Sequence, residues 1–126
     1  MGLWGIIMLV VCVMSATMIG FGLYFYLAGP KRINFVFGYR TPMSMKNLDT
    51  WKFGNAYAGR CMWSTGAVLL VGSLATLFAI MNSDETVIRT VGIIIVIAHA
   101  VMIFGSVIST EIALSKRFDR NGNRKG

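Results

Sequence analysis

The stretch from Gly38 to Arg60 holds the polar side chains that are best suited to recognise another molecule. Arg40 carries a planar guanidinium, which can bind a carbonyl, a lipid phosphate or an anionic partner. Trp51 and Asn55 lie one helical turn apart and therefore share a face. We expect Trp51 to anchor at the lipid headgroups and Asn55 to satisfy the turn backbone near Arg40. The sequence predicts that Arg40, Trp51 and Asn55 form one cluster, which is the functional surface.

His99 lies midway along a long apolar run, where an ionisable side chain is costly. It could relay a proton or bind a ligand. A simpler interpretation is a neutral imidazole that bonds to a hydroxyl on a neighbouring span, from Ser15, Thr17 or Ser73.

Glu111 lies three turns beyond His99, roughly 18 Å by helix rise, so the two cannot act together on one helix. We expect its carboxylate to meet a cation near the membrane interface, because an unpaired acid is unfavourable there. The candidate cations are Arg40, Arg60 and Lys116.

The chain shows no nucleophile beside a base, no metal-ligand cluster and no phosphate-binding loop. The two cysteines, Cys12 and Cys61, lack metal spacing and are interpreted as packing residues. We therefore expect a protein that is not an enzyme and that needs neither a cofactor nor a metal.

The composition indicates an integral membrane protein. Of 126 residues, 56% are hydrophobic and 13% are charged, whereas soluble domains have about 25% charged residues. The net charge of +7 could suggest nucleic acid, but the basic residues adjoin apolar runs. The expected partner is therefore the lipid bilayer, with no nucleic acid.

Three runs are long enough to span a bilayer, at about residues 3–28, 61–82 and 87–114. The predicted fold is all-α: one membrane domain forming a three-helix bundle, with a short interfacial helix between spans one and two. That helix could start after Thr41, with Pro42 at its first position, or after Ser44. Gly54 or Gly59 could bend it, and the basic tail at 115–126 is expected to be mobile.

Small residues in the second and third spans predict close helix contacts. Gly105, Ser109 and Ala113 recur every four residues. On this basis, replacing Gly105 by leucine should disturb packing more than replacing Ile95.

Basic residues predict the topology. Of the twelve Lys and Arg, only Arg89 lies in the short connection between spans two and three. The others lie between spans one and two or in the tail. The positive-inside rule therefore predicts a cell-membrane protein with the N-terminus outside and the signature loop at 38–60 and the C-terminus in the cytoplasm.

The loop resembles the signature of the SdpI family of small bacterial multi-pass membrane proteins. The matching residues are Gly38, Arg40, Thr41, Pro42, Lys46, Asn47, Trp51, Asn55 and Arg60. The best-known member of that family confers immunity to a secreted antimicrobial peptide toxin and takes part in signalling. The resemblance therefore implies a toxin-immunity or signalling protein, with a peptide toxin or a cytoplasmic regulator as partner.

Two other interpretations stay open. The chain could form a small transporter or channel as a homo-oligomer, with His99 as a polar lining group. It could also be an accessory subunit that packs against a larger membrane protein. In the protective interpretation, replacing Arg40 or Asn55 by alanine, or Arg40 by lysine, is expected to abolish protection.

Overall fold

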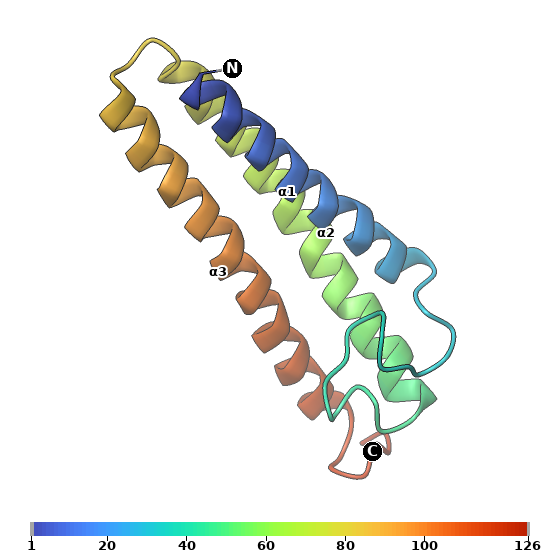
Figure 1. Ribbon diagram of the computed structural model, residues 1–126. Helices are drawn as coiled ribbons and strands as arrows, with labels where there is room; N and C mark the ends of the chain where they lie inside the picture. The colour runs from blue at the N-terminus through green and yellow to red at the C-terminus, as the bar shows by residue number, and fades with distance from the viewer. Residues whose placement is uncertain (1, 126) are drawn as a thin grey trace.

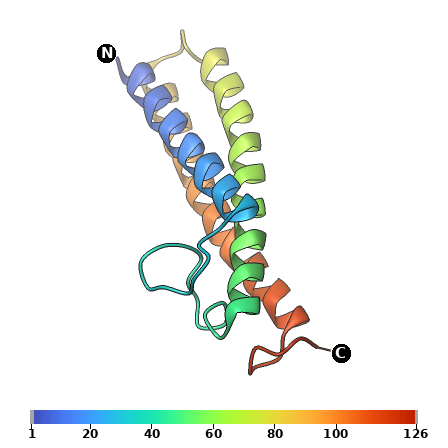
Figure 2. The same ribbon diagram turned by 90° about the vertical axis from the view of Figure 1, so that its right-hand side faces the viewer.

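The computed structural model describes residues 2–125, which fold into three long helices: α1 (Leu3–Leu27), α2 (Leu48–Ala79) and α3 (Glu85–Arg117). The helices pack side by side, and the α1–α2 connection and the C-terminal tail lie at the same end (Figure 1 and Figure 2). Each helix is long and apolar enough to cross a membrane. The predicted all-α bundle of three membrane-spanning helices is confirmed.

The prediction of a short interfacial helix before the second span is wrong. Residues 42–45 form a turn, and α2 begins at Leu48 and continues without a break to Ala79. Asn47 caps this helix: its side chain accepts from the Thr50 amide at 2.9 Å, and its own amide donates to Thr50 Oγ1 at 3.1 Å. This reciprocal cap starts the helix later than either predicted site.

Helix length explains why one helix replaces two. The 32 residues of α2 correspond to about 48 Å at 1.5 Å per residue, whereas a bilayer core is only about 30 Å thick. α2 is therefore long enough to cross the apolar layer with several turns to spare, and its first turns occupy the residues predicted for the interfacial helix.

Gly22 and Gly59 form a close contact between α1 and α2. A Cβ added at Gly59 would lie 2.5 Å from the Gly22 carbonyl oxygen and 2.5 Å from the Tyr26 nitrogen. Only glycine lets the two backbones approach this closely. Gly59 therefore serves helix packing, and no bend occurs there.

Gly105 does not pack as predicted. A Cβ at Gly105 would meet nothing within 4 Å, whereas Ile95 is buried with Val11 and Leu77 in the core between the helices. The prediction that Gly105 matters more than Ile95 is wrong, because the spacing of small residues does not show which helix face meets a neighbour.

The basic tail is folded, contrary to the expected mobility. Phe118 is buried, and Asp119 and Asn123 are joined by a backbone hydrogen bond of 2.8 Å. The Lys125 amide also donates to the Arg117 carbonyl at 2.9 Å. The chain therefore folds back on the end of α3 and forms a tight reverse turn.

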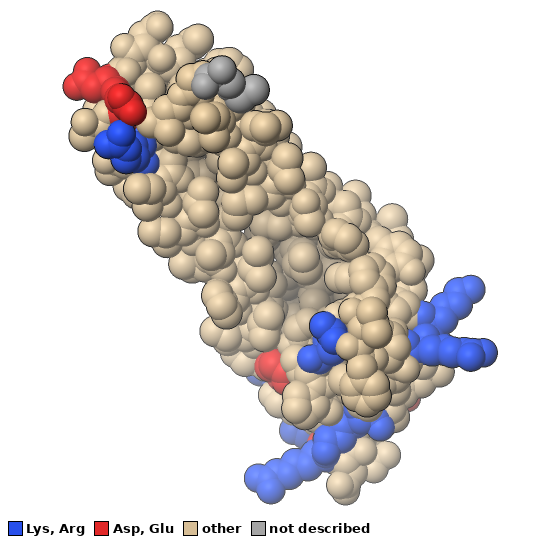
Figure 3. All heavy atoms as spheres, in the orientation of Figure 1, with Lys and Arg blue, Asp and Glu red and all other residues tan. Residues whose placement is uncertain are grey.

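Lys and Arg gather at the end of the bundle that carries the loop and the tail (Figure 3). At the opposite end Arg89 pairs with Glu85 at 3.0 Å on the exposed start of α3. Between the two ends the surface is mostly apolar, which suits contact with lipid.

Candidate functional site

Two side chains on the first turns of α2, Trp51 and Asn55, bind the connecting loop that folds over them. Trp51 is fully buried, and its indole Nε1 donates to the Pro30 carbonyl at 2.7 Å. The Asn55 side-chain oxygen accepts from the Tyr39 amide at 2.7 Å, and its Nδ2 donates to the Trp51 carbonyl at 2.9 Å. Two neighbouring side chains thus fix both ends of the segment 30–39.

The burial of Trp51 changes its predicted role. An anchor at the headgroups needs an accessible ring, and this ring is 0% exposed. The prediction of a lipid-interface anchor is therefore wrong. Its indole lies inside the protein because the loop folds over it.

Gly38 sits directly on this pair. Its φ of +115° lies in the region that favours glycine, and an added Cβ would be 2.8 Å from Asn55 Oδ1 and 3.1 Å from Trp51 Cη2. Both conformation and space therefore require glycine.

Gly38→Ala should weaken the loop by about 2 kcal/mol, from left-handed strain and the clash together. Amide hydrogen exchange over residues 31–47 should rise, while exchange within α1 and α3 stays unchanged. Gly72→Ala is the matched control, because nothing lies within 4 Å of that position. Equal exchange in both variants would contradict this role for Gly38.

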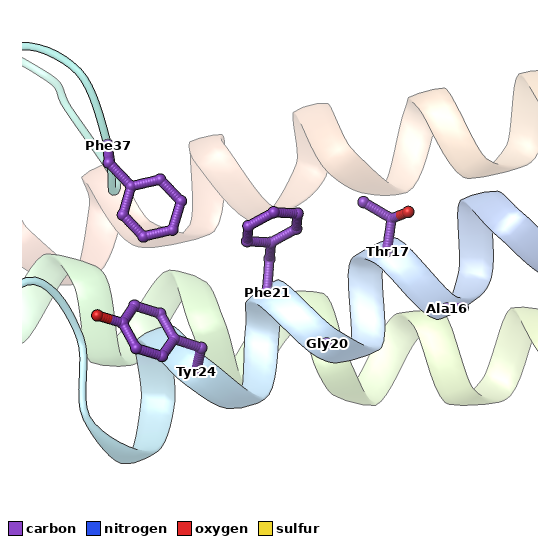
Figure 4. A pocket seen from close by; sticks show the side chains of 6 residues that line it. All are labelled: Ala16, Thr17, Gly20, Phe21, Tyr24 and Phe37. Atoms are coloured by element: carbon purple, nitrogen blue, oxygen red, sulfur yellow. The ribbon is translucent and has the colours of Figure 1, made fainter.

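Phe37 attaches the loop to α1. Its ring centroid lies 5.2 Å from that of Phe25 and 5.7 Å from those of Phe21 and Tyr24. Figure 4 shows it beside a hollow of about 540 Å³ on the outer side of α1. Ala16, Thr17 and Gly20 complete the lining of this hollow.

Arg40 is exposed, and its Nη1 donates to the Phe35 carbonyl within the same loop. A carbonyl is one of the three kinds of partner expected for this guanidinium. Among the described residues, the Arg40 side chain forms no hydrogen bond with Trp51 or Asn55. Arg40 therefore lies on the outer side of the loop, and the predicted three-residue cluster divides into a buried pair and an exposed arginine.

The Thr41–Ser44 turn follows, with Pro42 exposed at its tip. Thr41 and Ser44 bond reciprocally, at 2.9 and 3.2 Å, and the buried Ser44 hydroxyl also donates to the Tyr39 carbonyl at 3.0 Å. The sequence analysis named Ser44 only as a possible residue before a helix start, and it missed the role of the hydroxyl in this turn. The position of Ser44 three residues after Thr41 is the local signal for such a turn.

Asn47 joins the loop to the tail. While its side-chain oxygen caps α2, its Nδ2 donates to the Gly122 carbonyl at 2.7 Å. Gly122 has a φ of +83°, and a Cβ added there would lie 2.6 Å from Asn47 Nδ2 and 3.0 Å from Lys46 Cβ. The loop, α2 and the tail are therefore one connected structure.

Glu111 meets none of its predicted cations among the described residues. Its carboxylate accepts from the Tyr39 hydroxyl at 2.6 Å, so the expected ion pair is wrong. Burial of Tyr39, followed by this hydrogen bond, raises the pKa of the phenol above its usual range. The hydroxyl consequently stays protonated and acts as a donor that links the loop to α3.

His99 is separate from the loop, in the middle of the bundle. It is fully buried, with Nε2 2.8 Å from the Ser15 hydroxyl and Nδ1 2.9 Å from the Ile95 carbonyl. A carbonyl only accepts, so Nδ1 carries a proton and donates to Ile95, and the Ser15 hydroxyl is the partner of Nε2. Of the two interpretations, these contacts match the bond to a hydroxyl on a neighbouring span.

Arg60, the last of the predicted motif residues, is exposed on α2, and its carbonyl accepts from the Ser64 hydroxyl at 2.7 Å. With Lys46, also exposed, it belongs to the basic end of the bundle and not to the buried pair.

A three-span membrane bundle with an ordered polar loop defines the general class of this molecule. The model of the SdpI/YfhL protein family matches residues 31–110, which include the loop, all of α2 and most of α3. The chain belongs to the SdpI/YfhL protein family. No curated protein and no solved structure matches it.

Proposed function

We propose that this protein protects its membrane against a membrane-active peptide toxin, and that it acts by binding and not by catalysis. Family membership supports this proposal, because the resemblance to SdpI implies immunity or the associated signalling. Within the family region, the loop between α1 and α2 is the surface that we assign to the interaction.

One observation carries this assignment. Phe35 and Val36 are 84% and 85% exposed although the loop that bears them is held at Trp51, Asn55 and Phe37. Large apolar side chains held out from an ordered segment are typical of an interaction site. A loop that only connected two helices would need no such exposed pair.

The surroundings of Phe35 and Val36 are cationic. They therefore suit a peptide with an anionic group better than a cationic or neutral amphipathic peptide. Arg40 lies beside them, bonded to the Phe35 carbonyl, and Lys31 and Arg32 are exposed at the start of the loop. The apolar hollow beside Phe37 could receive a side chain of the bound peptide (Figure 4). Apolar contact would then supply affinity, and the cations would select the partner.

We further propose that the loop and the C-terminus face the cytoplasm. The concentration of Lys and Arg at this end supports this orientation. From that side the loop could meet a peptide that has crossed the bilayer, or hold a cytoplasmic regulator at the membrane.

Reporter fusions test the orientation. A reporter that is active only in the cytoplasm should work when fused after Gly126 and fail when fused before Met1. The reverse pattern would contradict the proposed orientation.

A challenge assay tests the function. Cells with and without the gene would be exposed to a panel of membrane-active peptides, and survival and solute flux would be measured. Higher survival of the cells that carry the gene, without a change in flux, is the expected result. Equal survival against every peptide would refute protection, and a solute flux that depends on the gene would favour a transporter.

A further inference from the structure

A second hollow lies at the basic end of the bundle, apart from the loop surface. It has a volume of about 530 Å³ and is lined by Phe53, Ala113, Lys116, Arg117, Arg124 and Lys125. Four of these six residues are cations, and the other two are apolar.

The fold of the tail brings the four cations together. Lys116 and Arg117 end α3, and Arg124 and Lys125 return to them across the reverse turn. An antiparallel bridge between Phe118 and Arg124 sets this register. The bond from Asn47 to the Gly122 carbonyl holds the turn against the loop. Two basic pairs that are distant in sequence are thus positioned side by side.

The charge in this hollow is only partly compensated. Arg124 lies 3.8 Å from the Asp49 carboxylate, and both side chains are more than half exposed, so this pair contributes little. Asp119 uses its carboxylate inside the turn, where it accepts from the amides of Asn121 and Asn123. Arg117 stacks over the Phe53 ring at 5.2 Å, which fixes the position of its guanidinium without neutralising it.

We propose that this hollow binds the phosphate of an anionic ligand, either the headgroup of an acidic phospholipid or free phosphate. Four like charges held around one space repel one another, and a phosphate would relieve that repulsion while accepting several hydrogen bonds. Basic pockets at the ends of membrane helices suit lipid headgroups. Phe53 and Ala113 offer an apolar wall beside the cations, as an acyl chain would require. This site does not depend on the proposed toxin immunity.

The test uses the full-length protein in detergent and counts bound molecules by native mass spectrometry. The probes are phosphatidylglycerol, phosphatidylcholine and inorganic phosphate, each added separately. The variant is Lys116→Gln with Lys125→Gln, because neither side chain makes a hydrogen bond or ion pair among the described residues. The matched control is Lys52→Gln with Arg60→Gln, which removes the same charge at the same end from exposed positions that do not line this hollow.

Phosphatidylglycerol should bind the wild type more tightly than phosphatidylcholine does. The double variant Lys116→Gln with Lys125→Gln should weaken phosphatidylglycerol binding by about twenty-five-fold, or roughly fivefold per lysine. The control pair should bind as the wild type does. If the wild type binds inorganic phosphate and the Lys116→Gln with Lys125→Gln variant does not, free phosphate is identified as the ligand. An equal loss in both pairs, or no preference for either anionic probe over phosphatidylcholine, would overturn the proposal.

Discussion

Gly59→Ala is expected to destabilise the bundle by about 3 kcal/mol or more, at the upper end of the cost of overpacking. The added Cβ would meet the backbone of α1 at the Gly22 oxygen and the Tyr26 nitrogen, each 2.5 Å away. Backbone atoms cannot turn aside as a flexible side chain can, so α1 and α2 would have to separate. Thermal unfolding in detergent, followed by circular dichroism, measures the change.

Gly105→Ala is the control for this substitution. It also places a methyl group on a helix glycine, but at a position with nothing within 4 Å. Its unfolding temperature should match or exceed that of the wild type, because alanine favours helix more than glycine does. Equal destabilisation of the two variants would show that the loss at Gly59 does not come from the contact between α1 and α2.

Trp51→Ala is expected to have the second large effect, about 3–5 kcal/mol, typical of removing a buried tryptophan. The loss would include the indole hydrogen bond to Pro30 and the packing under Gly38. We expect residues 31–47 to exchange amide hydrogens rapidly in this variant, while the three helices still insert in the membrane.

Two tryptophan-to-phenylalanine variants separate the contribution of the indole hydrogen bond to stability from the contribution of packing. Trp51→Phe removes an indole donor that is bonded to the Pro30 carbonyl at 2.7 Å. Trp63→Phe removes an indole nitrogen that is buried without a partner among the described residues. Trp51→Phe should therefore cost about 1–3 kcal/mol more than Trp63→Phe, because it leaves a carbonyl unpaired. Equal costs would mean that the bond to Pro30 does not hold the loop.

The membrane spans could be predicted from sequence because uncharged runs of this length have few other stable forms. The end of α1 also follows from local chemistry, since Gly29 readily adopts the left-handed conformation of a helix C-terminal cap and Pro30 lacks the amide that the next helical hydrogen bond would need. Gly29 indeed has a φ of +70°. These features depend on local chemistry, which a single sequence displays directly.

The residues that belong to the loop motif could be predicted from the sequence, but the way in which they pack could not. Trp51 and Asn55 were correctly placed on one helix face, yet the sequence did not show that the chain folds over that face and buries it. The contacts that decide this are between distant residues, such as the bond from Tyr39 to Glu111. Tyr39 lies between Gly38 and Arg40 in the motif, so its position was the one available signal.

The arrangement divides the motif by role. Gly38, Trp51 and Asn55 are inside and hold the loop, whereas Arg40 is outside with Phe35 and Val36. Substitutions of the inner residues would remove activity and loop structure together. Substitutions of the outer residues would remove activity alone, which makes them the better test of function.

The most direct test is the survival of cells that carry Phe35→Ser with Val36→Ser, challenged with a membrane-active peptide against which the wild-type protein protects. Membrane abundance and loop hydrogen exchange would be measured in the same cells and protein, and Val68→Ser with Val71→Ser on the exposed side of α2 is the control. The account predicts that the loop variant is inserted and ordered like the wild type but no longer protects, and that the control still does. Full protection by the loop variant would contradict the claim that this loop is the surface through which the protein acts.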